Sequence, residues 1–140
     1  MKILIPIDDS DTSLHAIDWL ARLPQPAAIE VNLVNVRPPA ENFGAVSALD
    51  FEAVERSLRE GQQYVLARAL EHAQRLGLPQ VTIHAAHGMA SEAIVDAAKA
   101  TGADQIVMAT HGRGAVGTFF MGSVAQQVVH LAPMAVTLVK

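Results

Sequence analysis

The residues best suited to chemistry lie between positions 109 and 123, where the chain reads ATHGRGAVGTFFMGS. An apolar run, Gln105–Ala109, precedes this glycine-rich segment, and an apolar-periodic run, Val124–Leu131, follows it. The order strand, glycine-rich loop, helix start suits a phosphate, because glycines let backbone N–H groups approach a ligand and a helix N-terminus offers unpaired donors. Ser123 adds a hydroxyl that could cap the helix or donate to an anion. The alternative is a surface loop whose glycines only form turns.

Two catalytic readings use neighbouring residues. Ser123, His111 and Asp8 have the residue types of a hydrolytic triad, but the chain has no GxSxG sequence and nothing orients the histidine as a base. Nucleotide hydrolysis would need Mg²⁺, a positioned water and a compensating cation. No lysine follows the glycines as in GxxxxGKS or GxxxxGKT, and no nearby acid is marked as a metal ligand. Any hydrolysis should therefore be slow.

The histidines do not have the spacing of a metal site. His84 and His87 are three residues apart in an expected strand, so they should point to opposite faces. No HExxH sequence is present, and three other histidines fall on expected helices, where surface roles are the simpler interpretation: His15, His72 and His130. His111 could bond a phosphate, act as a base, or hold the loop through a bond from its ring to the backbone.

Composition restricts the class of protein. A chain of 140 residues predicts one domain, residues 1–140, with a core that needs no covalent staples. Hydrophobic residues make up 51% and charged residues 17%, which is typical of soluble globular proteins, and the net charge of −4 argues against a nucleic-acid partner. No apolar window is long enough to span a membrane, and the start of the chain lacks the features of a signal peptide. The absence of cysteine excludes disulfides and thiol catalysis, and a cytoplasmic location is expected.

Strand-like and helix-like segments alternate along the chain. Apolar runs predict strands at five places: Lys2–Ile7, Ile29–Val36, Val81–Ala86, Gln105–Ala109 and Ala135–Val139. Helical spacing predicts the intervening helices: from Ser10 or Asp11 to Leu23, Phe51–Leu76, from Ser91 to Gly102, and Val124–Leu131. In the second strand, Asn35 continues the face formed by Ile29, Val31 and Leu33.

This alternation predicts an α/β fold, an open and mostly parallel sheet with helices on both faces. Ligands of such sheets bind beyond the carboxyl ends of the strands, where the strand order reverses. Asp8 and the glycine-rich segment both follow strands at that edge. The connection 37–50 lacks periodicity, and we expect a partly ordered loop near the ligand end.

Several stretches, taken in order, resemble the universal stress protein family over nearly the whole chain. They are the opening ILIPIDDS, the turn GMASEAIV before the third helix, ADQIVMATHGRG around the fourth strand, and GSVA and APMAVTLV at the end. The resemblance implies a three-layer α/β/α fold with a five-stranded parallel sheet in the order 3-2-1-4-5, a Rossmann-like architecture of the adenine nucleotide alpha hydrolase type. It also implies a nucleotide-dependent module for stress response or signalling.

Members of that family with an ATP site carry Gly, two residues, Gly, nine residues, Gly, then Ser or Thr. Gly112, nine residues, Gly122 and Ser123 match this pattern, whereas Ala109 stands at the position of the first glycine. The extra methyl group would lie where the ribose passes. The alternatives are a family member that acts as a protein-interaction scaffold without ATP, and a slow Mg²⁺-dependent ATPase.

The resemblance also implies roles for single residues, with ATP, ADP or AMP as ligand, with or without Mg²⁺. Asp8 would accept from the ribose or the adenine side, and the backbone of Val36 would bond the adenine edge. For Asp8 the alternative is a helix cap, which Asp9 or Ser10 could provide instead. The implied set of binding residues is Pro6, Ile7, Asp8, Val36, Met108, Ala109, His111, Gly112, Arg113, Gly122, Ser123 and Val124.

The last strand, Ala135–Val139, predicts how the chain assembles. It is apolar and should lie at an edge of the sheet. Lys140 is the only charged residue beside it that would discourage pairing with another strand. Antiparallel pairing with a second copy would satisfy the edge, and a two-fold dimer is the commonest closed assembly. The family resemblance implies the same homodimer; the alternative is a monomer with a short, twisted edge.

Overall fold

The computed structural model describes residues 1–43, 47–111 and 121–140. Within them the strands are β1 (Lys2–Pro6), β2 (Glu30–Arg37), β3 (Val81–His87), β4 (Gln105–Ala109) and β5 (Ala135–Val139). The α-helices are α1 (Asp11–Ala21), α2 (Ala48–Arg75), α3 (Ala90–Thr101) and α4 (Ser123–Leu131). Two short 3₁₀ helices are η1 (Pro26–Ala28) and η2 (Ala40–Phe43).

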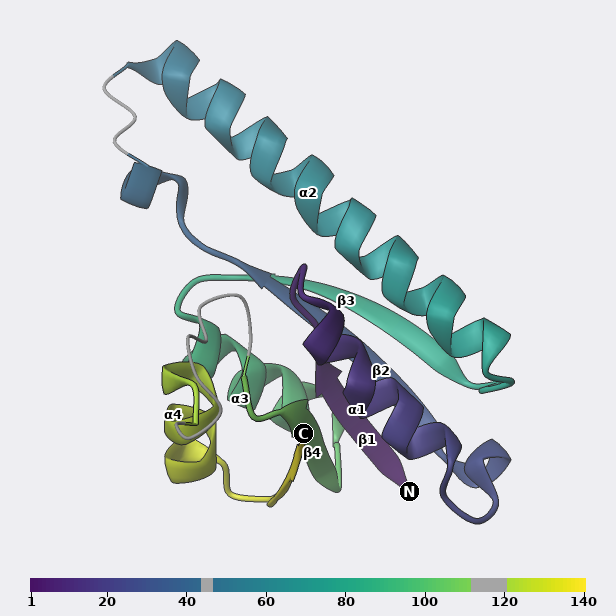
Figure 1. Ribbon diagram of the computed structural model, residues 1–140. Coiled ribbons are helices and arrows are strands. Elements are labelled where there is room, and N and C mark those ends of the chain that lie inside the picture. The colour runs from purple at the N-terminus through teal and green to yellow at the C-terminus, as the bar shows by residue number, and fades with distance from the viewer. Residues whose placement is uncertain (44–46, 112–120) are drawn as a thin grey trace.

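The strands form one parallel sheet in the order β3-β2-β1-β4-β5 (Figure 1). This confirms the predicted strand order. β1 lies at the centre, where Ile5 is in register with Leu33 of β2 and Leu4 with Ile106 of β4. The order reverses there, because the chain leaves β1 toward β2 and β3 and later returns to β4 on the other side.

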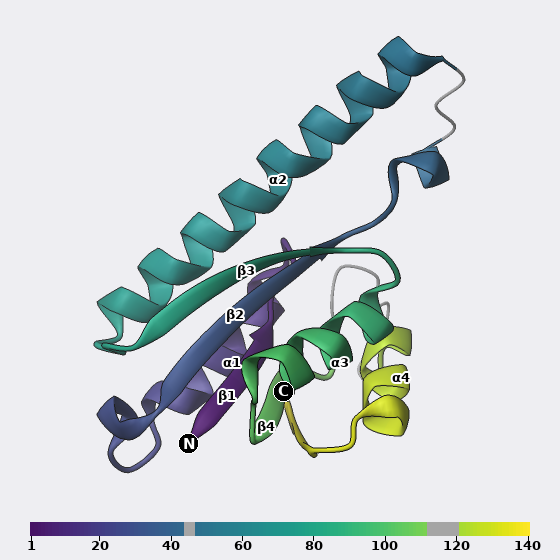
Figure 2. The same cartoon turned by 180° about the vertical axis from the view of Figure 1, so that it is seen from behind.

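Helices cover both faces of the sheet, as predicted (Figures 1 and 2). α1 and α2 pack over one buried cluster, whose members include Ile3, Ile5, Ile17, Leu20, Leu33, Val65 and Val107. α3 and α4 pack over the other, whose members include Leu4, Val34, Ile94, Val95, Ile106 and Val128. Successive residues of β1 and β4 thus enter opposite clusters, which explains why these two strands are continuous apolar runs.

Local signals set the ends of the helices. Ser10 is the N-cap of α1 and accepts from the N–H of Ser13, as one of the two predicted caps. α3 ends at Gly102 and α2 is followed by Gly77, whose φ angles of 64° and 78° lie in the left-handed region that glycine adopts without strain.

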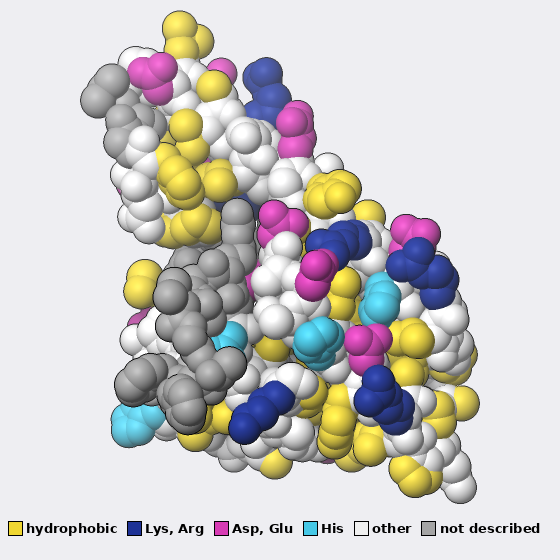
Figure 3. All heavy atoms as spheres, viewed as in Figure 1, with side chains coloured by type: hydrophobic (Ala, Val, Ile, Leu, Met, Phe, Trp, Pro, Cys, Tyr) yellow, Lys and Arg dark blue, Asp and Glu magenta, His cyan; other side chains and the backbone are white. Residues whose placement is uncertain are grey.

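The connection between β2 and α2 is shorter than its sequence predicts. β2 extends to Arg37, η2 gives part of the connection regular structure, and α2 begins at Ala48 because Ser47 caps it by accepting from the N–H of Asp50 at 3.1 Å. The first turns of α2 project beyond the sheet (Figures 1 and 2). Hydrophobic side chains gather on that end of the molecule in Figure 3, where Phe43, Leu49 and Phe51 are exposed. Among the described residues, no helix is long and apolar enough to cross a membrane.

Candidate functional site

Two hydrogen bonds to Ile7 tie the end of β1 to β2. The N–H of Ile7, just beyond the strand, donates to the carbonyl of Val34 at 2.8 Å. The carbonyl of Ile7 accepts from the side-chain amide of Asn35 at 2.7 Å. Ile7 itself is buried and Pro6 is half-buried. Asp8 therefore starts from a fixed point at the carboxyl edge of the sheet.

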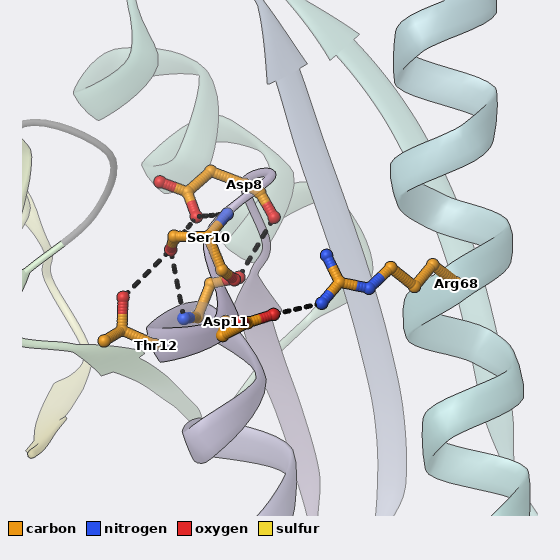
Figure 4. Close-up of polar contacts among 6 residues, drawn as sticks. Asp8, Ser10, Asp11, Thr12 and Arg68 are labelled. Atoms are coloured by element: carbon orange, nitrogen blue, oxygen red, sulfur yellow. Dashed lines mark hydrogen bonds and ion pairs between the residues drawn. The ribbon is translucent and has the colours of Figure 1, made fainter.

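Asp8 and Ser10 form a compact turn into α1 (Figure 4). One carboxylate oxygen of Asp8 accepts from the N–H of Ser10 at 3.0 Å and from the Ser10 hydroxyl. The carbonyl of Asp8 accepts from the hydroxyl of Ser13 at 3.0 Å. Ser10 is the residue that caps α1, so the carboxylate of Asp8 supports the cap and does not provide it.

The start of α1 is also tied to α2. Arg68 reaches from α2 to the carboxylate of Asp11 (Figure 4). Further along the two helices, Nε2 of His72 lies 2.7 Å from the carboxylate of Asp18. These two contacts fix α1, and with it the Asp8 turn, against α2.

The end of β4 joins the starts of α1 and α4. The N–H of Thr110 donates to Val139 at 2.9 Å, and its carbonyl accepts from the N–H of Gly122 at 2.8 Å. The carbonyl of His111 accepts from the hydroxyl of Thr12 at 3.3 Å. The start of α1, the residues after β4 and the N-cap of α4 thus meet at one edge of the sheet. Ala109, half-buried, ends β4 just before this junction.

The His111 ring bonds the side chain of its neighbour. Its Nδ1 lies 2.8 Å from the hydroxyl of Thr110. Its Nε2 is buried and has no hydrogen-bond partner among the residues that the structure describes. One ring nitrogen thus bonds the adjacent hydroxyl. The predicted bond from the ring to the loop backbone concerns residues 112–120, which lie outside the described residues.

Gly122 has an ordinary backbone and room for a side chain. Its φ and ψ of −61° and 149° are open to any residue, and it is the N-cap of α4. A Cβ built there would meet, among described atoms, Thr110 O at 3.4 Å and His111 Cα at 3.7 Å, which is ordinary van der Waals contact. Ser123 is exposed as the first residue of α4, so its hydroxyl does not cap that helix. Gly112 and Arg113 lie outside the described residues.

Three further predicted residues belong to the core on one side of the sheet. Met108 is buried in the cluster beneath α3 and α4, and Val36 and Val124 pack against that cluster. Their side chains therefore serve the core, and only the backbone of Val36 is left for the role that the sequence assigns to it. Val36 lies in β2, next to β1.

Sequence reasoning missed two polar residues next to this edge. Asn35 and Gln62 are almost fully buried, and both donate to backbone carbonyls at the ends of strands. Asn35 lies on the apolar face of β2, as the sequence predicts. Nothing in the sequence indicates the hydrogen-bond partners of either amide.

A hollow of about 250 Å³ lies beside α2 and next to Val36, since its lining includes Arg37, which follows Val36, and Ala86, the register partner of Val36 on β3. The side chains of Arg37, Arg59 and His87 are among those that line it. Arg37 is held by Glu55 through contacts of 2.6 and 2.9 Å, and Arg59 lies 3.5 Å from the same carboxylate. Within the described part of the chain, no cluster of three or more His, Asp or Glu side chains could hold a metal ion.

Comparison with known proteins gives consistent results. A model of the Universal stress protein family matches residues 1–140. A universal stress protein of Thermus aquaticus is 33% identical over 138 residues, which cover 99% of this chain and 97% of the relative.

Solved structures show the same fold at lower identity. UspA of Lactobacillus plantarum has a TM-score of 0.84 at 19% identity, covering 100% of this chain and 97% of the other. A universal stress protein of Archaeoglobus fulgidus in complex with dAMP has a TM-score of 0.72 at 21% identity, covering 100% and 98%. A family protein of Arabidopsis thaliana with AMP bound has a TM-score of 0.70 at 16% identity, covering 100% and 91%.

Proposed function

The chain belongs to the universal stress protein family, and from that premise we propose that it binds an adenine nucleotide, ATP in particular, at the carboxyl edge of β1 and β4. The bound nucleotide would set the state of a module for stress response or signalling. The residues proposed to contact it are those predicted from the sequence. Relatives bound to AMP and dAMP support the adenine nucleotide as the ligand class.

The observation that carries this proposal is the glycine at position 122. Its backbone angles do not require glycine, and the described atoms around it leave room for a Cβ. Neither strain nor packing against the described atoms therefore explains the missing side chain. Close approach of a phosphate to the start of α4 does explain it, because the first N–H groups of a helix lack partners within the helix and attract anions.

The other end of the ligand would lie toward β2. Asp8 is held half-buried at the end of β1, and Val36 lies one strand away. A carboxylate there suits ribose hydroxyls, and a backbone N–H and C=O suit the edge of adenine. The buried Nε2 of His111, which lacks a partner among the described residues, supports a polar group of the ligand nearby.

Hydrolysis, with or without Mg²⁺, is expected to be slow at most. The sequence has no lysine after its glycines to neutralise charge on the transferred phosphoryl group. Binding, and not turnover, is thus the proposed activity.

We also propose a homodimer through β5. This strand lies at the edge of the sheet, as predicted, and its outward backbone groups are available for pairing within the described structure. Antiparallel pairing of two copies would extend the sheet across a two-fold axis.

The test is the ligand of the purified protein. Heat release followed by chromatography should yield ATP, ADP or AMP, and ATP added to the emptied protein should bind by titration calorimetry. Absence of released nucleotide together with no binding at millimolar ATP would favour the scaffold without a nucleotide.

A further inference from the structure

Asn35 and Gln62 are buried polar residues at positions where an apolar side chain is the rule. On the same face of β2, Val31 and Leu33 are apolar and fully buried, and the face continues with Asn35. On α2, the other buried residues are Val65, Leu66, Ala69 and Ala73. Both amides occur where the sheet ends, and burial of an amide is costly unless its hydrogen bonds are made.

Gln62 joins β2 and β3 at the level of Val36. Its amide nitrogen donates to the carbonyl of Asn35 at 2.8 Å and to the carbonyl of Ala86 at 2.7 Å. Asn35 directly precedes Val36, and Ala86 is the register partner of Val36 on β3. Both acceptors are carbonyl oxygens, so only the NH₂ group of the side chain can make these bonds.

Asn35 continues the connection to β1. Its amide donates to the carbonyl of Ile7, the residue before Asp8. The hydrogen bonds therefore run without a gap from α2, through the end of β2, to the end of β1. They end on the carbonyls of Asn35, Ala86 and Ile7. These carbonyls adjoin Val36 and Asp8, the two residues that the proposed function assigns to the nucleoside.

We infer that Asn35 and Gln62 are positioning residues for nucleotide binding: they touch no ligand, and they fix the backbone of Val36 and the start of the Asp8 turn. This inference rests on the proposed function. α2 is thereby coupled to the nucleoside end of the site. The start of α4 is held by separate bonds to the end of β4, so it does not depend on these amides.

The test compares Gln62→Met and Asn35→Leu, which remove the donors while keeping a side chain of similar shape. Two controls match them. Gln63→Met makes the same exchange at the exposed neighbour, and Val65→Ala loosens the buried face of α2 without removing a polar contact. ATP affinity is measured by calorimetry on the full chain, and stability by urea unfolding.

Each positioning variant should weaken ATP roughly tenfold, the scale of one buried hydrogen bond left unmade. Gln63→Met should bind as the wild type does, and Val65→Ala should lose stability yet keep its affinity within about twofold, since a folded domain retains its site. If only one of the two positioning variants folds, the ATP affinity of that variant decides the test.

Wild-type affinity in the folded positioning variants would overturn the inference and leave the proposed function intact. An equal loss of affinity in Val65→Ala would also overturn it, because general loosening would then explain the effect. A wild-type protein that binds no ATP would overturn the proposed function itself, and this inference with it.

Discussion

Ala109 is the one residue of the predicted glycine pattern that departs from the family. It ends β4 half-buried, next to the junction of α1, β4 and α4. Its methyl group adds bulk at the position where the ribose is proposed to pass.

We expect Ala109→Gly to tighten ATP binding by about 1 kcal/mol, the scale of a small packing strain relieved. Titration calorimetry measures it. Ala135→Gly is the control, because it makes the same exchange at the first residue of β5, at the amino end of the sheet opposite to the site. Weaker binding in Ala109→Gly would mean that the methyl group is accommodated and that the departure does not limit affinity.

At the scale of elements, two helices begin with the same type of cap but at different distances from the site. Ser10 caps α1 and bonds the carboxylate of Asp8, whereas Ser47 caps α2 at its exposed end. A cap contributes to stability wherever it is, but only the cap of α1 also holds a proposed binding residue.

Ser10→Ala and Ser47→Ala should each lower the free energy of unfolding by about 1 kcal/mol, as loss of a serine cap does. Only Ser10→Ala should also weaken ATP, because it releases the Asp8 turn. Urea unfolding and calorimetry on both variants check this. Equal ATP affinity in the two variants would exclude the Asp8 turn from the site.

The elements could be predicted from the sequence because apolar runs, helical spacing and turn residues agree with one another along the chain. The earlier start of α2 had a signal, since Ser47 and Asp50 have the spacing of a cap, but the segment 37–50 has no clear apolar periodicity to show that a helix begins there. The edge position of Asp8 could be predicted from parallel strands alone. The roles of Asn35 and Gln62 could not, because their partners are backbone carbonyls that carry no side-chain signature.

At the scale of the whole molecule, the edge strand β5 determines how copies could associate. The carbonyl of Val139 accepts from Thr110 on the β4 side. Alternate residues of a strand direct their peptide groups to opposite edges, so the N–H of Val136 points outward. A partner strand would pair there.

Val136→Pro should shift the proposed dimer to monomer, because it removes an outward donor and spares the bonds between β4 and β5. Val136→Ala is the matched control, since it shortens the side chain and keeps the N–H. Analytical ultracentrifugation at tens of micromolar, roughly where dimers of moderate affinity form, gives the answer. A wild-type monomer, with or without ATP, would contradict the dimer.

Nucleotide binding at the start of α4 is the central claim, and Gly122 tests it most directly because a Cβ there makes only ordinary van der Waals contact with the described atoms. In calorimetric titrations, ATP should bind the wild type, bind Gly122→Ala more weakly and fail to bind Gly122→Val. All three proteins should unfold at similar urea concentrations. Equal ATP affinity in the wild type and Gly122→Val would contradict the proposed site.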